Sequence, residues 1–250
     1  GTWDLFKYPG IRSDSDMHTL GFRFKPWIHD KSIADGPSIM EYLHETINEY
    51  KLNDNILLNH KVDSANWNSK KSQWELKINV NNDLKDMTCD FFFLCGGYYS
   101  YTKPHMPYFK NQENFKGQIV HPQFWDESLD YKNKKIAVIG SGATAITIVP
   151  AIAEQAEHVV MIQRSPTYVV SGPSEDVINK FLRRILPVRI TYFLIRWKNI
   201  LYQSFTFFMA RKYPERTKNK ILDLAKNEIG VENVNPVSYT HLTLPTNLCV

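Results

Sequence analysis

The amino-acid sequence predicts an α/β fold that combines a parallel βαβ unit with a separate antiparallel β-meander. Residues 134–164 predict, in order, a buried strand, KKIAVIG, a helix, TAITIVPAIAEQA, and a second strand, HVVMIQR. A strand, a helix and a strand in this order give a parallel pair. Three other strand-like runs, near 55–62, 73–80 and 89–95, are separated by the turn compositions NSKKS and NNDLKD, which is typical of a meander.

Composition and charge narrow the class of protein. The 250 residues are 43% hydrophobic and 13% aromatic, enough for a core in one large domain or two ordinary ones. The three cysteines have neither a C-x-x-C pair nor a framework or metal-ligand spacing, which favours a reduced, cytoplasmic compartment and predicts no metal site. A net charge of +4 is too small to indicate binding to nucleic acid.

A helix is predicted over residues 36–50, because apolar side chains recur at helical spacing from Ile39 to Ile47. The sequence Ser38-x-x-Glu41 predicts a capping box at its start. The third strand-like run ends in a pair of glycines, which lets the backbone turn sharply or approach a ligand closely.

The turn after the KKIAVIG strand has the pattern G-x-G-x-x-A. It consists of Gly140, Ser141, Gly142, Ala143, Thr144 and Ala145. The first glycine permits the tight turn, the second lets the main chain approach a pyrophosphate, and the small alanine lets the helix pack close to the strand. Because the pattern lies between a strand and a helix of a βαβ unit, it predicts dinucleotide binding. The alternative is a tight turn without a ligand.

The end of the second strand indicates which dinucleotide is bound. An NAD site usually has an acidic residue there, whereas this chain has Arg164 and Ser165. An arginine pairs with a 2′-phosphate in bidentate fashion, and a serine hydroxyl adds a hydrogen bond. The sequence therefore favours NADPH over NADH. The alternative is an arginine at a solvated strand end.

Two further patterns accompany the glycine-rich turn. The pattern F-x-G-x-x-x-H-x-x-x-W-D is carried by Phe115, Gly117, His121, Trp125 and Asp126. The opening pattern G-x-W-x(4)-Y-P-G-x-R-x-D is carried by Gly1, Trp3, Tyr8, Pro9, Gly10, Arg12 and Asp14. Together they resemble the fingerprints of type I Baeyer–Villiger monooxygenases and the related flavin-containing monooxygenases. The resemblance extends over residues 1–230 and is greatest for the ethionamide-activating branch.

The resemblance implies an α/β flavoenzyme with two dinucleotide-binding (Rossmann-like) domains, a β-meander and a helical insertion, of which this chain is an incomplete piece. On this basis residues 1–130 are a partial FAD-binding domain with the meander and the linker fingerprint, and residues 131–236 are the NADP-binding domain with the insertion. NADPH would reduce FAD, and a peroxyflavin would then insert one oxygen atom of O2 into a ketone or transfer it to a sulfide.

The family also implies roles for single residues. Trp3, Tyr8, Arg12 and Asp14 would line the flavin side, with Asp14 as the candidate catalytic residue, and His121 and Trp125 would couple NADP binding to domain movement. Each has a structural alternative: a turn or helix cap for Asp14, a surface ion pair for Arg12, a hydrogen-bonded structural histidine and a core tryptophan.

Three features depart from the family pattern. The FAD pyrophosphate loop and the active-site arginine are expected outside this sequence, so the chain alone is expected to be inactive. Tyr98 replaces a different polar residue of many relatives.

Residues 237–250 contain VSYTHLTLPT, which resembles a translated sequencing-library adapter. This tail is therefore expected to be an artefact; the alternative is an edge strand.

Residues 177–228 are strongly basic, with twelve Lys or Arg against three acidic residues, and rich in aromatic residues. The family implies a helical insertion beside the substrate site. A peripheral membrane-surface helix and a solvated helical face are the alternatives. The alternative functions are an N- or S-oxygenating flavin-containing monooxygenase and a non-catalytic NADP-binding module. The oligomeric state is not predicted.

Overall fold

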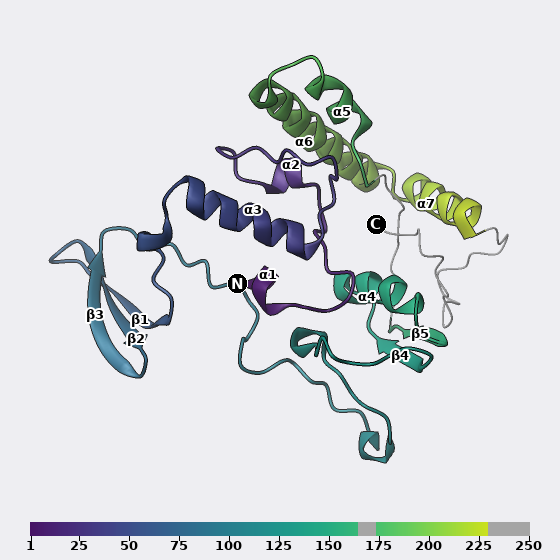
Figure 1. Ribbon diagram of the computed structural model, residues 1–250, viewed down its shortest axis with the longest axis horizontal. Helices are drawn as coiled ribbons and strands as arrows, with labels where there is room; N and C mark the ends of the chain where they lie inside the picture. Colours follow the sequence, from purple (N-terminus) through teal and green to yellow (C-terminus); the bar gives the residue numbers. More distant parts are fainter. Residues whose placement is uncertain (165–173, 230–250) are drawn as a thin grey trace. The chain divides into compact units, whose positions relative to one another are not determined.

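The computed structural model describes residues 1–164 and 174–229 (Figure 1). Its contacts divide the chain into two compact units, one of residues 1–42 and 106–250 and one of residues 43–105. Ser165 and the tail 237–250 lie outside the described residues. The domain boundary expected at residue 130 stays a prediction.

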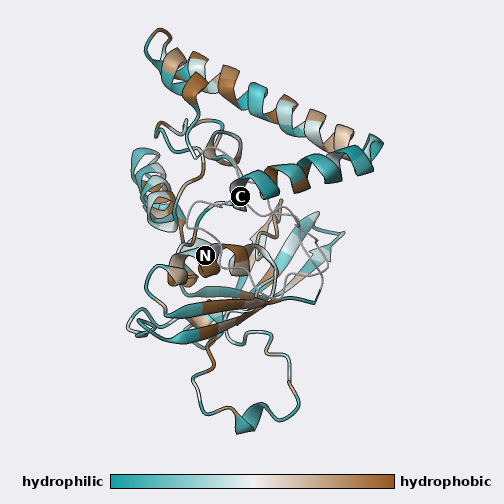
Figure 2. Cartoon of the chain, turned by 90° about the vertical axis from the view of Figure 1, so that its right-hand side faces the viewer, coloured by the Kyte–Doolittle hydropathy of each residue, from teal (hydrophilic) through white to brown (hydrophobic). Residues whose placement is uncertain are grey.

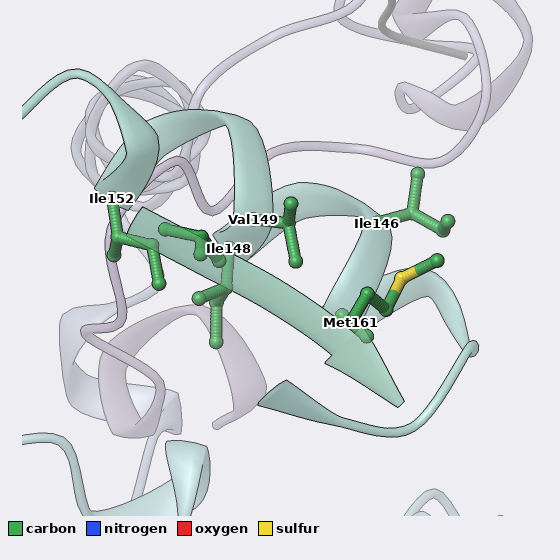
Figure 3. Close-up of a cluster of buried hydrophobic side chains, with 7 residues drawn as sticks. Ile146, Ile148, Val149, Ile152 and Met161 are labelled. Carbon is green, nitrogen blue, oxygen red and sulfur yellow. The ribbon is translucent and has the colours of Figure 1, made fainter. Parts of the chain in front are cut away.

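The predicted βαβ unit is present in the first unit. Strand β4 (Lys135–Ile139) and strand β5 (His158–Ile162) pair in parallel, with Ile136 opposite Val159, and helix α4 (Ala143–Ala153) connects them. The core of this unit consists of Ala145, Ile146, Ile148, Val149, Ile152, Val159 and Met161. Figure 3 shows side chains of α4, including Ile148 and Ile152, lying over β5, which contributes Met161.

Strand β4 is less buried than its apolar sequence predicts. Ile136 and Val138 pack against the core cluster, whereas Ile139, on the other face, is 61% exposed. Among the described residues β4 and β5 form a two-stranded sheet covered by α4 on one face. The expectation of a buried strand is therefore wrong for one of its two faces.

The second unit contains the predicted antiparallel meander of β1 (His60–Asn68), β2 (Gln73–Val80) and β3 (Asp83–Cys89), in the order β1-β2-β3. The prediction matches β2, but β1 begins later and β3 earlier than expected. Asn81 and Asn82 have φ angles of +53° and +74° and form a two-residue turn, so β3 resumes at Asp83. The predicted strand at 89–95 is wrong; Phe91 there is 81% exposed.

Helix α3 (Gly36–Glu49) confirms the prediction for residues 36–50, but its first turn is capped differently. The Asp35 carboxylate accepts hydrogen bonds from the Ser38 amide at 2.9 Å and from the Ser38 hydroxyl at 2.7 Å. Ser38 is thus a donor within the helix, and the predicted capping box that begins at Ser38 is wrong. A 3₁₀ turn, η1 (Asn53–Asn55), follows the helix.

The basic region is helical, as the family resemblance implies. It forms α5 (Val177–Arg183), α6 (Val188–Lys212) and α7 (Pro214–Ile229), and α6 packs against α2 (Met17–Leu20). In the part of the chain that the structure describes, no helix combines the length and apolar composition needed to cross a bilayer.

Candidate functional site

The G-x-G-x-x-A turn joins β4 to α4 and presents main-chain amides at the start of the helix. Gly140 has a φ angle of +139°, a conformation that favours glycine, and its amide donates to the Ile162 carbonyl at 2.8 Å. Gly142 is the N-cap residue of α4 and has no side chain with which to bond the first turn. The first-turn amides are therefore free of a side-chain cap and suited to an anion.

The space in front of this turn is open. A Cβ atom built on Gly142 would meet no atom of the described residues within 4 Å, and Gly142 and Ala143 are exposed. Ala145, in contrast, is buried in the core cluster beneath the turn. The turn therefore has the small residues and exposed backbone that a dinucleotide pyrophosphate requires.

Arg164 lies at the same edge of the sheet as the glycine-rich turn. It follows β5 by two residues, and the last residue of β5, Ile162, accepts the hydrogen bond from Gly140. The carboxyl ends of both parallel strands therefore meet here, which is where open α/β sheets bind ligands. Arg164 is exposed, so its guanidinium is accessible to a phosphate.

The N-terminal segment packs directly on α4 through Gly10. This residue has a φ angle of +76°, and a Cβ atom there would lie 2.8 Å from the Thr147 carbonyl oxygen and 2.9 Å from the Ala151 Cβ. Only glycine permits this approach. The contact brings the predicted flavin-side segment onto the helix of the predicted NADP-binding motif, a contact that no local sequence pattern signals.

Tyr8 connects predicted site residues from both parts of the chain. It packs against the α4–β5 core and forms a hydrogen bond with the Thr144 hydroxyl. Burial raises the pKa of Tyr8, the Thr144 hydrogen bond partly offsets this, and the negative charge of Asp14 raises it further. The structure thus brings Tyr8 close to Thr144 and within the electrostatic influence of Asp14.

The other flavin-side residues lie in the same N-terminal segment. Arg12 forms an isolated antiparallel bridge with Asp35, directly before α3. Trp3 is half-buried in the short helix α1 (Thr2–Leu5), and Asp14 is exposed. The carboxylate of Asp14 is therefore accessible from outside the chain.

Each fingerprint residue has a local structural role. The ring of Phe115 lies against Gly117, where any Cβ would overlap it. His121 accepts a hydrogen bond on Nδ1 from the Gln123 amide at 3.2 Å and so caps the 3₁₀ turn η3 (Pro122–Phe124). Trp125 packs against the α4–β5 core cluster and makes an edge-to-face contact with Tyr131 at 6.1 Å.

Asp126 completes the fingerprint by capping the next turn. It accepts hydrogen bonds from the Ser128 hydroxyl at 2.6 Å and the Ser128 amide at 2.8 Å, and these bonds lower the pKa of the exposed carboxyl. Trp125 is thus the fingerprint residue that packs against the dinucleotide-motif core. Phe115 and Asp126 lie at the surface, within their own turns.

Comparison with known proteins agrees with the family resemblance of the sequence. Residues 28–244, a range that extends into the suspected tail, match the family model described as flavin-binding monooxygenase-like. The chain is 49% identical over 230 residues to the FAD-containing monooxygenase EthA of Mycobacterium tuberculosis, covering 92% of this chain and 47% of that protein. It is 46% identical over 257 residues to the probable FAD-binding monooxygenase AlmA of Acinetobacter baylyi, covering 100% of this chain and 51% of that protein.

Solved structures of monooxygenases share the α/β architecture. The oxidized steroid monooxygenase bound to NADP matches with a TM-score of 0.63 and 26% identity over 77% of this chain and 36% of that chain. The OTEMO complex with FAD and NADP matches with a TM-score of 0.61 and 26% identity over 78% of this chain and 37% of that one. The chain spans about half the length of the curated relatives it matches, and it belongs to the flavin-binding monooxygenase-like family.

Proposed function

We propose that this chain is part of an FAD- and NADPH-dependent monooxygenase that inserts one oxygen atom of O2 into a ketone or adds it to a sulfide. Family membership supports this proposal, as do the FAD-containing relatives and the neighbours solved with FAD and NADP. When bound, FAD would supply the electrons that activate O2, and NADPH would supply them to FAD.

The observation that carries the proposal is the open, uncapped turn at Gly140–Ala145, beside the exposed Arg164. The turn's amides would bind the NADP pyrophosphate, and the guanidinium of Arg164 would pair with the 2′-phosphate. Ser165, outside the described residues, would add a hydroxyl to that phosphate. These roles favour NADP over NAD because no carboxylate follows β5 to bind a ribose 2′-hydroxyl.

Tyr8 and Asp14 would form the flavin-side part of the site. Burial and the nearby Asp14 carboxylate raise the pKa of the Tyr8 phenol, which would act as a hydrogen-bond donor. Asp14, exposed next to it, is the proposed catalytic residue, because an accessible carboxylate can orient a bound polar group or accept its proton. His121 and Trp125 would transmit movement of the linker to the α4–β5 core against which Trp125 packs.

The test is NADPH-dependent O2 uptake by the protein expressed from its full gene and loaded with FAD. A cyclic ketone and an alkyl sulfide would be supplied in turn, and the products identified by mass spectrometry. We expect lactone or sulfoxide formation that consumes one NADPH and one O2 per product.

The matched variants are Asp14→Asn and Asp4→Asn, both at exposed acidic positions near the N-terminus. Asp14→Asn should lower kcat by roughly 100-fold if the carboxylate takes part in proton transfer, whereas Asp4→Asn should have no effect. NADPH binding without O2 uptake for any substrate would instead indicate a non-catalytic NADP-binding module. An N-hydroxylated amine as the preferred product would indicate the N-oxygenating alternative.

A further inference from the structure

Helix α6 contacts the rest of the chain through a face that combines the buried Tyr192 and Ile195 with hydrogen-bonding side chains. Asn199 and Gln203 donate hydrogen bonds to the Asp16 carboxylate at 2.7 and 2.9 Å. Arg196 donates to the carbonyls of His18 and Gly21 at 2.8 and 3.1 Å. A surface helix of a globular protein ordinarily turns one apolar stripe toward the core, whereas α6 carries large apolar side chains on the opposite face as well.

The opposite face of α6 is an exposed apolar stripe. It consists of Ile190, Leu194, Trp197, Leu201, Phe205 and Phe208, each between 43% and 63% exposed. At 100° per residue these six side chains fall within a sector of about 80°, and at 1.5 Å per residue the stripe is about 27 Å long. Figure 2 shows apolar, brown turns recurring along the longest helix, whereas α7 is mostly hydrophilic.

The charges on α6 are all positive. Residues 188–212 contain Arg189, Arg196, Lys198, Arg211 and Lys212 and no acidic residue. At the C-terminal end, Lys212 lies 5.6 Å from the centre of the Phe208 ring and Arg211 lies 5.9 Å from that of Phe207. These four residues line a shallow cavity of about 390 Å³. Exposed cations therefore lie directly beside the aromatic stripe.

We propose that α6 is a membrane-surface helix that lies flat in the headgroup region of an anionic phospholipid bilayer, with the stripe directed into it. Aromatic and aliphatic side chains on one face with flanking cations are the composition that binds such an interface. Each lysine or arginine near the surface contributes about 1 kcal/mol of attraction to anionic lipid.

The charge pattern disfavours a second copy of the chain as the occupant. In an antiparallel pair of α6 helices, Arg189 of one copy would face Arg211 and Lys212 of the other, and in a parallel pair each cation would face its equivalent. Like charges opposed across an interface are repulsive. An anionic lipid surface instead complements the exposed cations at the two ends of the helix, which are Arg189, Arg211 and Lys212.

The experiment is co-sedimentation of the protein expressed from its full gene with two kinds of vesicle. One contains phosphatidylcholine and phosphatidylglycerol, and the other contains phosphatidylcholine alone. We expect salt-sensitive binding to the anionic vesicles. The charge variant Arg211→Gln/Lys212→Gln should weaken it roughly 30-fold, from two lost contributions of about 1 kcal/mol each.

The stripe variant is Trp197→Gln/Leu201→Gln/Phe205→Gln, which changes only exposed side chains. The matched control is Phe91→Gln/Phe93→Gln/Leu94→Gln, which removes equally apolar and even more exposed side chains outside any helix. Vesicle binding should fall to background in the stripe variant and persist in the control. Far-UV circular dichroism would verify that both variants keep their helix content.

A second readout does not depend on any multiple variant. Brominated lipids should quench the fluorescence component that Trp197→Phe removes, because Trp197 would lie at the depth of the acyl-chain boundary. Absence of this quenching, or equal vesicle binding by the stripe and control variants, would overturn the proposal. A dimer that the stripe variant converts to a monomer, without vesicle binding by the wild type, would also overturn it. So would binding of the wild type to an acidic protein but not to anionic vesicles.

Discussion

Replacing Gly10 with alanine is expected to weaken the contact between the N-terminal segment and α4. The φ angle of +76° at Gly10 costs an L-residue about 1–2 kcal/mol. The new Cβ would also lie 2.8 Å from the Thr147 carbonyl oxygen and 2.9 Å from the Ala151 Cβ, both closer than van der Waals contact. Overpacking of this kind costs about 1–3 kcal/mol, so the free energy of unfolding should fall by roughly 2–5 kcal/mol.

Two other glycines separate these contributions. Gly97 has a φ angle of +70° but no neighbour within 4 Å of a built Cβ among the described residues, so Gly97→Ala should show the backbone cost alone. Gly96 has neither feature, so Gly96→Ala should be neutral. The double variant Gly10→Ala/Ala151→Gly removes the Cβ–Cβ overlap and should show a favourable coupling energy in a double-mutant cycle.

Urea unfolding followed by far-UV circular dichroism would measure these differences, and amide hydrogen exchange of α4 would locate the effect. We expect Gly10→Ala to be clearly more destabilising than Gly97→Ala and to increase hydrogen exchange in α4. Equal losses for the two variants, with α4 unaffected, would refute the close packing of the N-terminal segment on this helix.

Further predictions concern the polar contacts between α2 and the basic helices. Burial lowers the pKa of His18 despite Asp16 and Asp176 nearby, with Lys198 and Arg183 adding to the lowering. The unfolded chain therefore binds a proton below about pH 6.5 that the folded chain does not, so stability should fall as pH decreases below that value. His18→Gln should flatten this slope in unfolding measured between about pH 7.5 and 5.5; an unchanged slope would assign it to other groups. Asp16→Ala leaves Asn199 and Gln203 without their acceptor and should cost about 2–4 kcal/mol, whereas Asp30→Ala, which breaks an exposed pair with Arg183, should cost less than about 1 kcal/mol. Equal unfolding midpoints for the two variants would contradict this ranking.

Sequence patterns predicted the helices and strands whose signal lies in neighbouring residues. The apolar run before Gly140 and the periodicity through α4 depend on neighbouring residues, and the βαβ unit is present as expected. The meander was predicted, but β3 begins earlier than expected because the Asn81-Asn82 turn is tighter than its polar flanks suggest, and β1 begins later than expected. The predicted cap of α3 was wrong for a different reason. Asp35 caps the helix by accepting two hydrogen bonds from Ser38.

Tertiary contacts within the candidate site could not be predicted in this way. The glycine-rich turn was identified, but the contacts of Tyr8 with Thr144 and of Gly10 with Ala151 join distant parts of the chain. Asp16 and Asn199, which are hydrogen-bonded, are 183 residues apart in sequence. The same holds for the inward face of α6, because the acceptors of its hydrogen bonds to Asp16 and His18 lie in and beside α2.

The most direct test of the central claim, that the β4–α4 turn and Arg164 form an NADP site, is calorimetric titration of this chain with NADP⁺ and NAD⁺. We expect NADP⁺ to bind more tightly than NAD⁺ and Arg164→Ala to weaken NADP⁺ binding by roughly 10- to 100-fold, the value of one charge-assisted contact to phosphate. NAD⁺ affinity should be unchanged by Arg164→Ala, and Arg189→Ala, at an exposed site on α6, should affect neither ligand. Equal losses for NADP⁺ and NAD⁺ in Arg164→Ala, or no NADP⁺ binding by the wild-type chain, would contradict it.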